Sequence, residues 1–110
     1  MITMITKELH NIILLIDSKL RDISKDISDK ESIYARSIKL NEEVWELMSL
    51  VLANYWDQRD EKLLDFSKEK LGHEFADVII TTLLLAKSMD IDINESLVSK
   101  LIKIKERWLI

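Results

Sequence analysis

The chain has 110 residues with no Cys, no Pro and a single Gly, and 33% of its residues are charged, with a formal net charge of -4. Without Cys it can form neither a disulfide scaffold nor a thiolate zinc site. Its mild acidity argues against the clustered basic surface that nucleic-acid binding mainly requires. The longest uncharged run, residues 78–86, is far shorter than the ~20 apolar residues of a membrane span. We therefore expect no nucleic acid and no membrane as partner.

Length and composition also predict the number of domains and the cellular compartment. A chain of this length can bury roughly two thirds of its surface, enough for one core, so we expect a single domain over residues 1–110. Residues 1–6 lack the basic segment and long apolar stretch of a secretory signal, and we expect them to be disordered or an addition to the native chain. These features favour a cytoplasmic protein.

The near absence of Gly and Pro predicts an all-α fold, because hairpins and tight turns depend on these residues. Apolar spacing predicts helices over about residues 7–24, 31–56 and 68–89, separated by a capping turn at 26–32 and a polar stretch at 57–65. Residues 90–94 predict the last turn, with Asn94 as the N-cap of a fourth helix that ends near Leu109.

The second predicted helix carries more apolar surface than one core needs. Wound at about 100° per residue, it has a core band and a second band beside it. The core band holds Ile33, Leu40, Val44, Leu47, Val51 and Tyr55, and the second band holds Tyr34, Ile38, Trp45, Leu52 and Trp56. We interpret the surplus as a subunit interface. The expected fold is a four-helix bundle completed by dimerisation, as a dimer or a dimer of dimers; complete burial within one chain is the alternative.

Two pairs of acids, each three residues apart, lie on predicted helices. Glu43 and Glu46 share a face beside the core band, and Glu74 and Asp77 lie in the narrow polar stripe of an otherwise apolar third helix. If these helices pack antiparallel, the four carboxylates converge and raise one another's pKa values unless a cation is bound. Oxygen ligands suit Mg²⁺ or Mn²⁺ together with substrate phosphates. The set predicts a phosphate-handling metal centre.

Solvated acidic faces are the competing interpretation of the same residues. Glu42 projects from the far side of its helix, and Lys70 or a charged His73 could neutralise the second pair. We interpret His73 as structural or supporting rather than as a ligand. A di-iron bundle is disfavoured, because neither His10 nor His73 follows a Glu by three residues.

The blocks Glu42-Glu-Val-Trp-Glu46 and Glu74-Phe-Ala-Asp77 resemble the EExxE and ExxD signature of MazG-like all-α nucleoside triphosphate pyrophosphohydrolases. The flanking residues 38–47 and 71–79 strengthen the resemblance, which extends from about residue 36 to residue 108. It implies a MazG-like bundle that hydrolyses an NTP or dNTP to the monophosphate and pyrophosphate with Mg²⁺, as a house-cleaning enzyme of the nucleotide pool.

The resemblance also implies roles for individual residues. Glu43 and Glu46 match the first ligand pair, and Glu74 and Asp77 match the second. We expect Glu46 to orient or deprotonate the attacking water. Lys103 and Arg107, on the basic face of the last helix, match the residues that hold the triphosphate; a favourable interaction with the helix dipole is the competing explanation for them.

Two other functions stay open from the sequence. A phosphoribosyl-ATP pyrophosphohydrolase of the same superfamily would share the fold. A non-enzymatic helical module would instead use the band containing Trp45 and Trp56 to bind a partner helix. The preferred base and sugar are not encoded in a recognisable pattern, because the Asn that some dCTP-specific relatives carry between the basic residues is missing.

Overall fold

The computed structural model describes residues 4–55 and 68–110. These residues form α-helices without any strand: α1 (Lys7–Ile23), α2 (Asp29–Tyr55), α4 (Lys68–Ser88) and α5 (Ile93–Trp108). The all-α prediction is confirmed, and the helices begin and end close to their predicted bounds. Trp56 and the predicted polar stretch at 57–65 lie outside the described residues. None of the described helices is long and apolar enough to cross a membrane.

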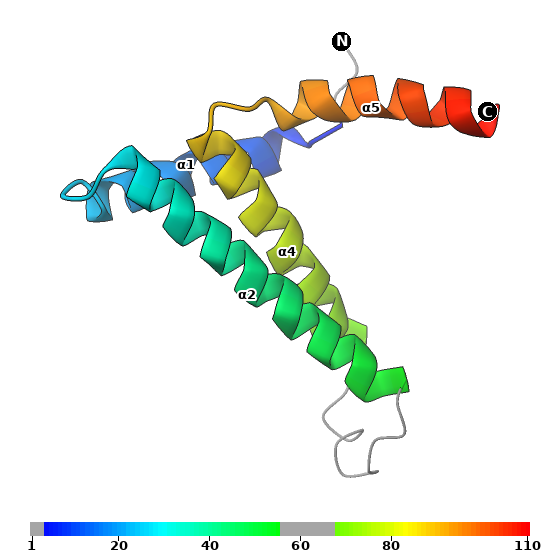
Figure 1. Cartoon of the computed structure of the whole chain (residues 1–110), viewed down its shortest axis with the longest axis horizontal. Helices are drawn as coiled ribbons and strands as arrows, with labels where there is room; N and C mark the ends of the chain where they lie inside the picture. The colour runs from blue at the N-terminus through cyan, green and yellow to red at the C-terminus, as the bar shows by residue number, and fades with distance from the viewer. Residues whose placement is uncertain (1–3, 56–67) are drawn as a thin grey trace.

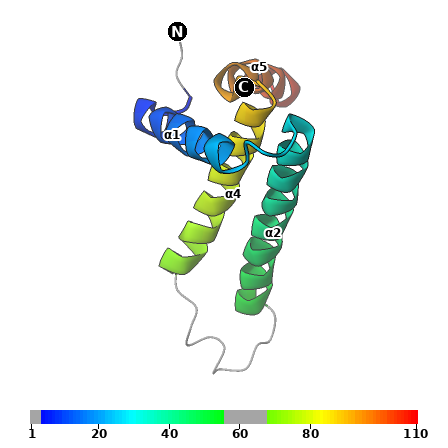
Figure 2. The same cartoon turned by 90° about the vertical axis from the view of Figure 1, so that its left-hand side faces the viewer.

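The antiparallel pair of α2 and α4 forms the body of the molecule, and α1 crosses one end of this pair and contacts α4 (Figures 1 and 2). The most buried apolar side chains lie at that end and are Ile13 of α1 with Leu83 and Ala86 of α4. Removal of such side chains from water is the main stabilising contribution to a fold of this kind. The core therefore holds α1 against the C-terminal half of α4.

A buried ion-pair network joins α1 to the α2–α4 pair. The Asp17 side chain accepts hydrogen bonds from Arg36 Nη1 at 2.7 Å and from Arg21 Nε at 3.0 Å. Arg36 also donates to the backbone oxygen of Leu84 at 3.0 Å, so its guanidinium connects α1, α2 and α4. Burial alone would raise the pKa of Asp17, but the hydrogen bonds from Arg36 and Arg21 hold this pKa below its usual value.

Polar side chains cap the turn between α1 and α2 as predicted. Ser28 Oγ accepts a hydrogen bond from the backbone N–H of Glu31 at 3.1 Å. Such a bond satisfies one of the backbone donors that a helix N-terminus leaves without an intrahelical partner. Ser28 therefore fixes the start of α2.

The predicted N-cap of the last helix is wrong by two residues. Asp92 is the N-cap of α5, and its side chain accepts from the backbone N–H of Glu95 at 3.2 Å. Asn94 lies inside the helix, where its Oδ1 accepts from the backbone N–H groups of Met4 at 2.6 Å and Ile5 at 3.3 Å. Asp and Asn are about equally good N-caps. The Asn94 side chain instead binds the N-terminal segment, and Asp92 caps the helix.

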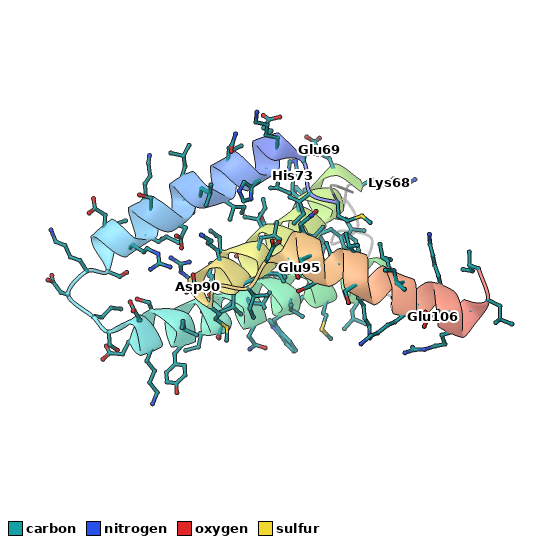
Figure 3. The ribbon with its side chains drawn as sticks, turned by 90° about the horizontal axis from the view of Figure 1, so that it is seen from above. Lys68, Glu69, His73, Asp90, Glu95 and Glu106 are labelled. Atoms are coloured by element: carbon teal, nitrogen blue, oxygen red, sulfur yellow. The ribbon has the colours of Figure 1, made fainter. Side chains whose placement is uncertain are left out.

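Helix α5 projects from the body as an arm (Figure 1). Among the described residues it makes no extensive contact with α2 or α4. Figure 3 shows Glu95 over the body and Glu106 at the far end of the arm. The predicted four-helix bundle is therefore not closed within one chain.

Large apolar side chains remain on the outer faces of α2 and α4. Tyr34, Ile38, Trp45 and Leu52, the described members of the second apolar band, are all exposed. Phe75 and Ile79 on α4 are 49% and 56% exposed, so the apolar surface of this helix is not fully covered within the single chain. A hydrophobic pattern identifies faces that favour burial, but it does not say whether the same chain covers them.

Candidate metal centre

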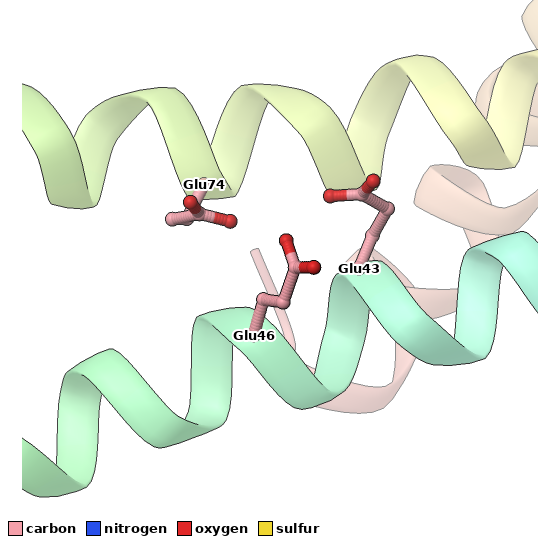
Figure 4. A group of neighbouring side chains, drawn as sticks. All are labelled: Glu43, Glu46 and Glu74. Carbon is pink, nitrogen blue, oxygen red and sulfur yellow. The ribbon is translucent and has the colours of Figure 1, made fainter.

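Three glutamates meet between α2 and α4 (Figure 4). Glu43 and Glu46 lie one turn apart on α2, and Glu74 faces them from α4. One carboxylate oxygen from each residue lies within 4.8 Å of those of the other two. Oxygens that share a hard cation at about 2.0–2.6 Å lie within roughly 5 Å of one another, so this separation fits one divalent ion.

The cluster is buried at one end and open to solvent at the other. Glu43 is only 8% exposed, Glu74 is half-buried and Glu46 is exposed. Glu43 Oε2 and Glu74 Oε2 are buried and have no hydrogen-bond partner within the described residues. A buried carboxylate oxygen without a partner costs free energy, which a bound cation would recover. The donor set is entirely oxygen and suits Mg²⁺ or Mn²⁺.

Lys39 partly neutralises the buried end of the cluster. Its Nζ lies 3.2 Å from Glu43 Oε1 and 3.6 Å from Glu42 Oε2. We did not predict this lysine from the sequence, although its position four residues before Glu43 is a usual spacing for helical ion pairs. The lysine side chain is 58% exposed, so solvent screens its interaction. When all groups are ionised, one ammonium against three carboxylates leaves two negative charges, which a divalent cation would balance.

The pKa of Glu74 reflects the crowding of negative charge. Loss of solvent around its carboxylate raises this pKa, and the nearby charges of Glu46, Asp77 and Glu43 raise it further. The charge of His73 acts in the opposite direction. His73 is exposed, and it acts on the site through this electrostatic effect.

Asp77, the fourth predicted ligand, lies outside the converging group. It is exposed on α4, although its charge is close enough to raise the pKa of Glu74. Three residues along a helix correspond to about 300°, so Asp77 points roughly 60° away from the direction of Glu74. Glu42 is exposed as predicted and pairs with Lys39 at the surface. The antiparallel packing therefore unites three of the four predicted ligands.

The two predicted phosphate-binding residues lie on the α5 arm. Lys103 lines an open hollow on the outside of that helix together with Lys100 and Ser99. Because α5 makes no extensive contact with α2 or α4 within the described ranges, one chain alone does not bring Lys103 and Arg107 to the glutamates.

A cavity of about 620 Å³ lies away from the glutamates, between the start of α1 and the turn that joins α4 to α5. Its lining includes Ile13, Leu14, Leu83 and Ile91, with Lys87 among its polar groups, and contains none of the three acids. Its size is within the range of ligand pockets. The candidate chemistry nevertheless lies with the glutamates, because they combine convergence with unpartnered buried oxygens.

Comparison of the chain with protein-family models, with curated proteins and with solved structures returns no match. The resemblance of the two acidic blocks to the MazG-like signature thus stays a prediction from the sequence. The geometry of Glu43, Glu46 and Glu74 stands independently of that resemblance.

Proposed function

We propose that this chain is a divalent-metal-dependent nucleoside triphosphate pyrophosphohydrolase of the MazG-like kind, using Mg²⁺ or Mn²⁺. The observation that carries this proposal is the pair of buried, unpartnered oxygens, Glu43 Oε2 and Glu74 Oε2, in a cluster completed by Glu46. A bound cation would stabilise such a cluster, and a cation held by carboxylates at an open site is typical of phosphate-handling enzymes. The acidic blocks supply the link to nucleotides through their resemblance.

The residues have distinct roles in this proposal. Glu43 and Glu46 of α2 and Glu74 of α4 would hold the ion, and a rotation of the Asp77 side chain would add a fourth ligand. The bound ion would neutralise charge on the phosphate oxygens and acidify a water molecule. Glu46, at the solvent-facing end, orients that water and accepts its proton. The water oxygen bonds to the α-phosphorus, the bond from this phosphorus to the bridging oxygen breaks, and pyrophosphate leaves with the electron pair.

The remaining parts of the proposal concern the substrate and the assembly. Lys103 and Arg107 contact the triphosphate of an NTP or dNTP once α5 or a second copy brings them near the glutamates. A homodimer or homotetramer is proposed because the outer apolar band of α2 is exposed in the single chain. A role in removing unwanted nucleotides in the cytoplasm follows from the family resemblance.

The first test is release of pyrophosphate from a panel of NTPs and dNTPs in the presence of Mg²⁺. Glu43→Gln or Glu74→Gln is expected to lower this rate at least about 100-fold, because loss of a metal ligand should cost no less than loss of the groups that support ligands. EDTA is expected to abolish it. Glu42→Gln is the matched control, since Glu42 is adjacent, exposed and paired with the same lysine.

Several results would contradict the proposed activity. Release of orthophosphate alone, no release from any nucleotide, or equal rates for Glu43→Gln and Glu42→Gln would each argue against it. A non-enzymatic helical module is the second candidate function, and it is favoured by the 66% exposure of Trp45. It predicts no hydrolysis and no stabilisation by divalent ions, since an ion that binds only the folded state must stabilise it.

A further inference from the structure

The exposed apolar side chains of α2 form a continuous stripe on the side away from α4. We call this the outer stripe of α2; its members are Tyr34, Ile38, Trp45, Met48 and Leu52, which are between 43% and 66% exposed. At about 100° per residue they fall within roughly 80° of one another. With Asn41 they follow the alternating spacing of three and four residues that is typical of a helix–helix seam.

Helix α5 carries a matching stripe on the projecting arm. The α5 stripe consists of Leu97, Leu101, Ile104 and Trp108, which repeat at intervals of four, three and four residues. Leu97, Leu101 and Trp108 are 40%, 36% and 70% exposed. The arm has 16 residues, or about 24 Å, which is long enough to cover a comparable length of α2.

The charges of the two helices are complementary. Helix α2 contains five acidic and three basic residues, whereas α5 contains two acidic and four basic residues. On a helical wheel Glu42 lies beside one edge of the outer stripe, with Glu46 farther round on the same side, and Lys100 and Arg107 lie on the opposite side of the α5 stripe. Parallel packing brings such opposite edges together, as in parallel coiled coils. Charge and spacing thus both favour contact between these two stripes.

The exposed area indicates that a second copy supplies this contact. The chain exposes 9056 Å², whereas a compact monomer of its mass would expose roughly 6,300 Å². Covering the difference on two copies would bury roughly 5,500 Å² in total, which is the size of an obligate homodimer interface. An arm that extends away from its own α2 is suited to reach the α2 of a second copy (Figures 1 and 3).

We propose that the α5 stripe of one copy packs in parallel along the outer stripe of α2 of a second copy, in a reciprocal two-fold dimer. This interface does not depend on the proposed chemistry. One consequence rests on the proposed function: the same contact carries Arg107 of one copy toward the edge of α2 that holds Glu46 of the other. Basic residues that a single chain keeps apart from the cluster would then complete the site of the second copy.

The mass of the protein in solution, measured by light scattering, tests the interface. The native chain is expected to be a dimer or a dimer of dimers, and Trp45→Glu or Leu101→Glu is expected to yield monomers with unchanged helical circular dichroism. Leu15→Glu is the matched control, because Leu15 is 62% exposed on α1 and lies outside both stripes. A monomeric native chain, or dissociation of the control to the same extent, would overturn the interface.

Cross-linking then identifies which stripes meet, and it still decides the question if the glutamate variants fail to fold. The chain has no Cys, so introduced thiols are unique. Ser49→Cys protein and affinity-tagged Lys100→Cys protein are mixed and treated with a flexible bismaleimide; both sites are exposed. We expect covalent heterodimers between the two proteins. Cross-links only between two copies of the same variant, or no cross-links at all, would contradict the α2–α5 contact. Mass and cross-links are read without nucleotide, so an inactive enzyme leaves the interface result unaffected.

Discussion

Glu74 has a raised pKa because its carboxylate is desolvated and lies near the charges of Glu46, Asp77 and Glu43. The folded chain therefore retains a proton on Glu74 at pH values where the unfolded chain has lost it. By linkage, the free energy of unfolding of metal-free protein falls as pH rises from about 4.5, the ordinary value, through the raised pKa.

Urea unfolding in EDTA at a series of pH values measures this effect. Glu74→Gln is expected to flatten the fall in unfolding free energy, because the amide has no proton to lose. Mg²⁺ is expected to oppose the fall in the native chain, since it stabilises the ionised cluster. Identical pH profiles for the native chain and the Gln variant would show that the cluster is too well solvated to need an ion.

Asp17 is the residue whose loss should harm the fold most directly. It is 5% exposed, and its partner Arg36 has a side chain that is only 11% exposed. Asp17→Asn leaves a buried guanidinium without its counter-charge, which is expected to cost about 3–5 kcal/mol of unfolding free energy. Asp22→Asn, at an exposed position on the same helix, is the control and should cost little.

The lowered pKa of Asp17 fixes the sign of the pH dependence. The stabilisation by Asp17 is fully present above its ordinary value of 3.8 and is lost as pH falls through the lower folded value. The difference between native chain and Asp17→Asn in denaturant unfolding should therefore shrink in acid. Equal stability of the two proteins at neutral pH would mean that the network contributes no net stability.

At the scale of elements, the first turn of α5 is expected to fray locally when its N-cap is removed, while the helix pair stays folded. Asp92→Ala removes the N-cap hydrogen bond to the Glu95 N–H and should cost about 1 kcal/mol. Amide hydrogen exchange is expected to speed up in the first turn of α5 and to stay unchanged in α2 and α4. Ser96→Ala in the same turn is the control. Uniformly faster exchange in all helices would contradict this local effect.

The helices could be predicted from the sequence because their bounds follow from local apolar spacing and capping residues. The N-cap of α5 could not, because Asp92 and Asn94 are equally suitable and the choice depends on contacts of Asn94 with Met4 and Ile5, about ninety residues away in the sequence. The exposure of Phe75 and Ile79 could not be predicted either. Their apolar character indicates that burial is favourable, but it does not tell whether the same chain or another molecule buries them.

The candidate site was predictable to the extent that it depends on helix geometry. Antiparallel packing of two helices accounts for the meeting of Glu43, Glu46 and Glu74. The position of Asp77 outside the group depends on the rotation of α4 about its axis, which sequence spacing does not fix. The pairing of Lys39 with Glu43 follows a recognisable four-residue spacing and could have been predicted.

At the scale of the whole molecule, one copy looks incomplete. The radius of gyration of its Cα atoms is 17.2 Å, whereas a compact domain of this length has about 13 Å. The extended shape results from the projecting arm and the uncovered outer stripe of α2. A second copy that packs between them would cover both surfaces. The dimer would leave the solvent-facing end at Glu46 next to an inter-subunit groove, where a substrate can enter.

Mn²⁺ binding, followed by electron paramagnetic resonance, shows whether the three glutamates hold a divalent cation. We expect the native chain and Glu42→Gln to bind Mn²⁺ saturably, with Mg²⁺ as competitor, and Glu43→Gln and Glu74→Gln to lose this binding. Equal Mn²⁺ binding by all four proteins, or none by the native chain, would contradict the metal centre and with it the proposed hydrolysis.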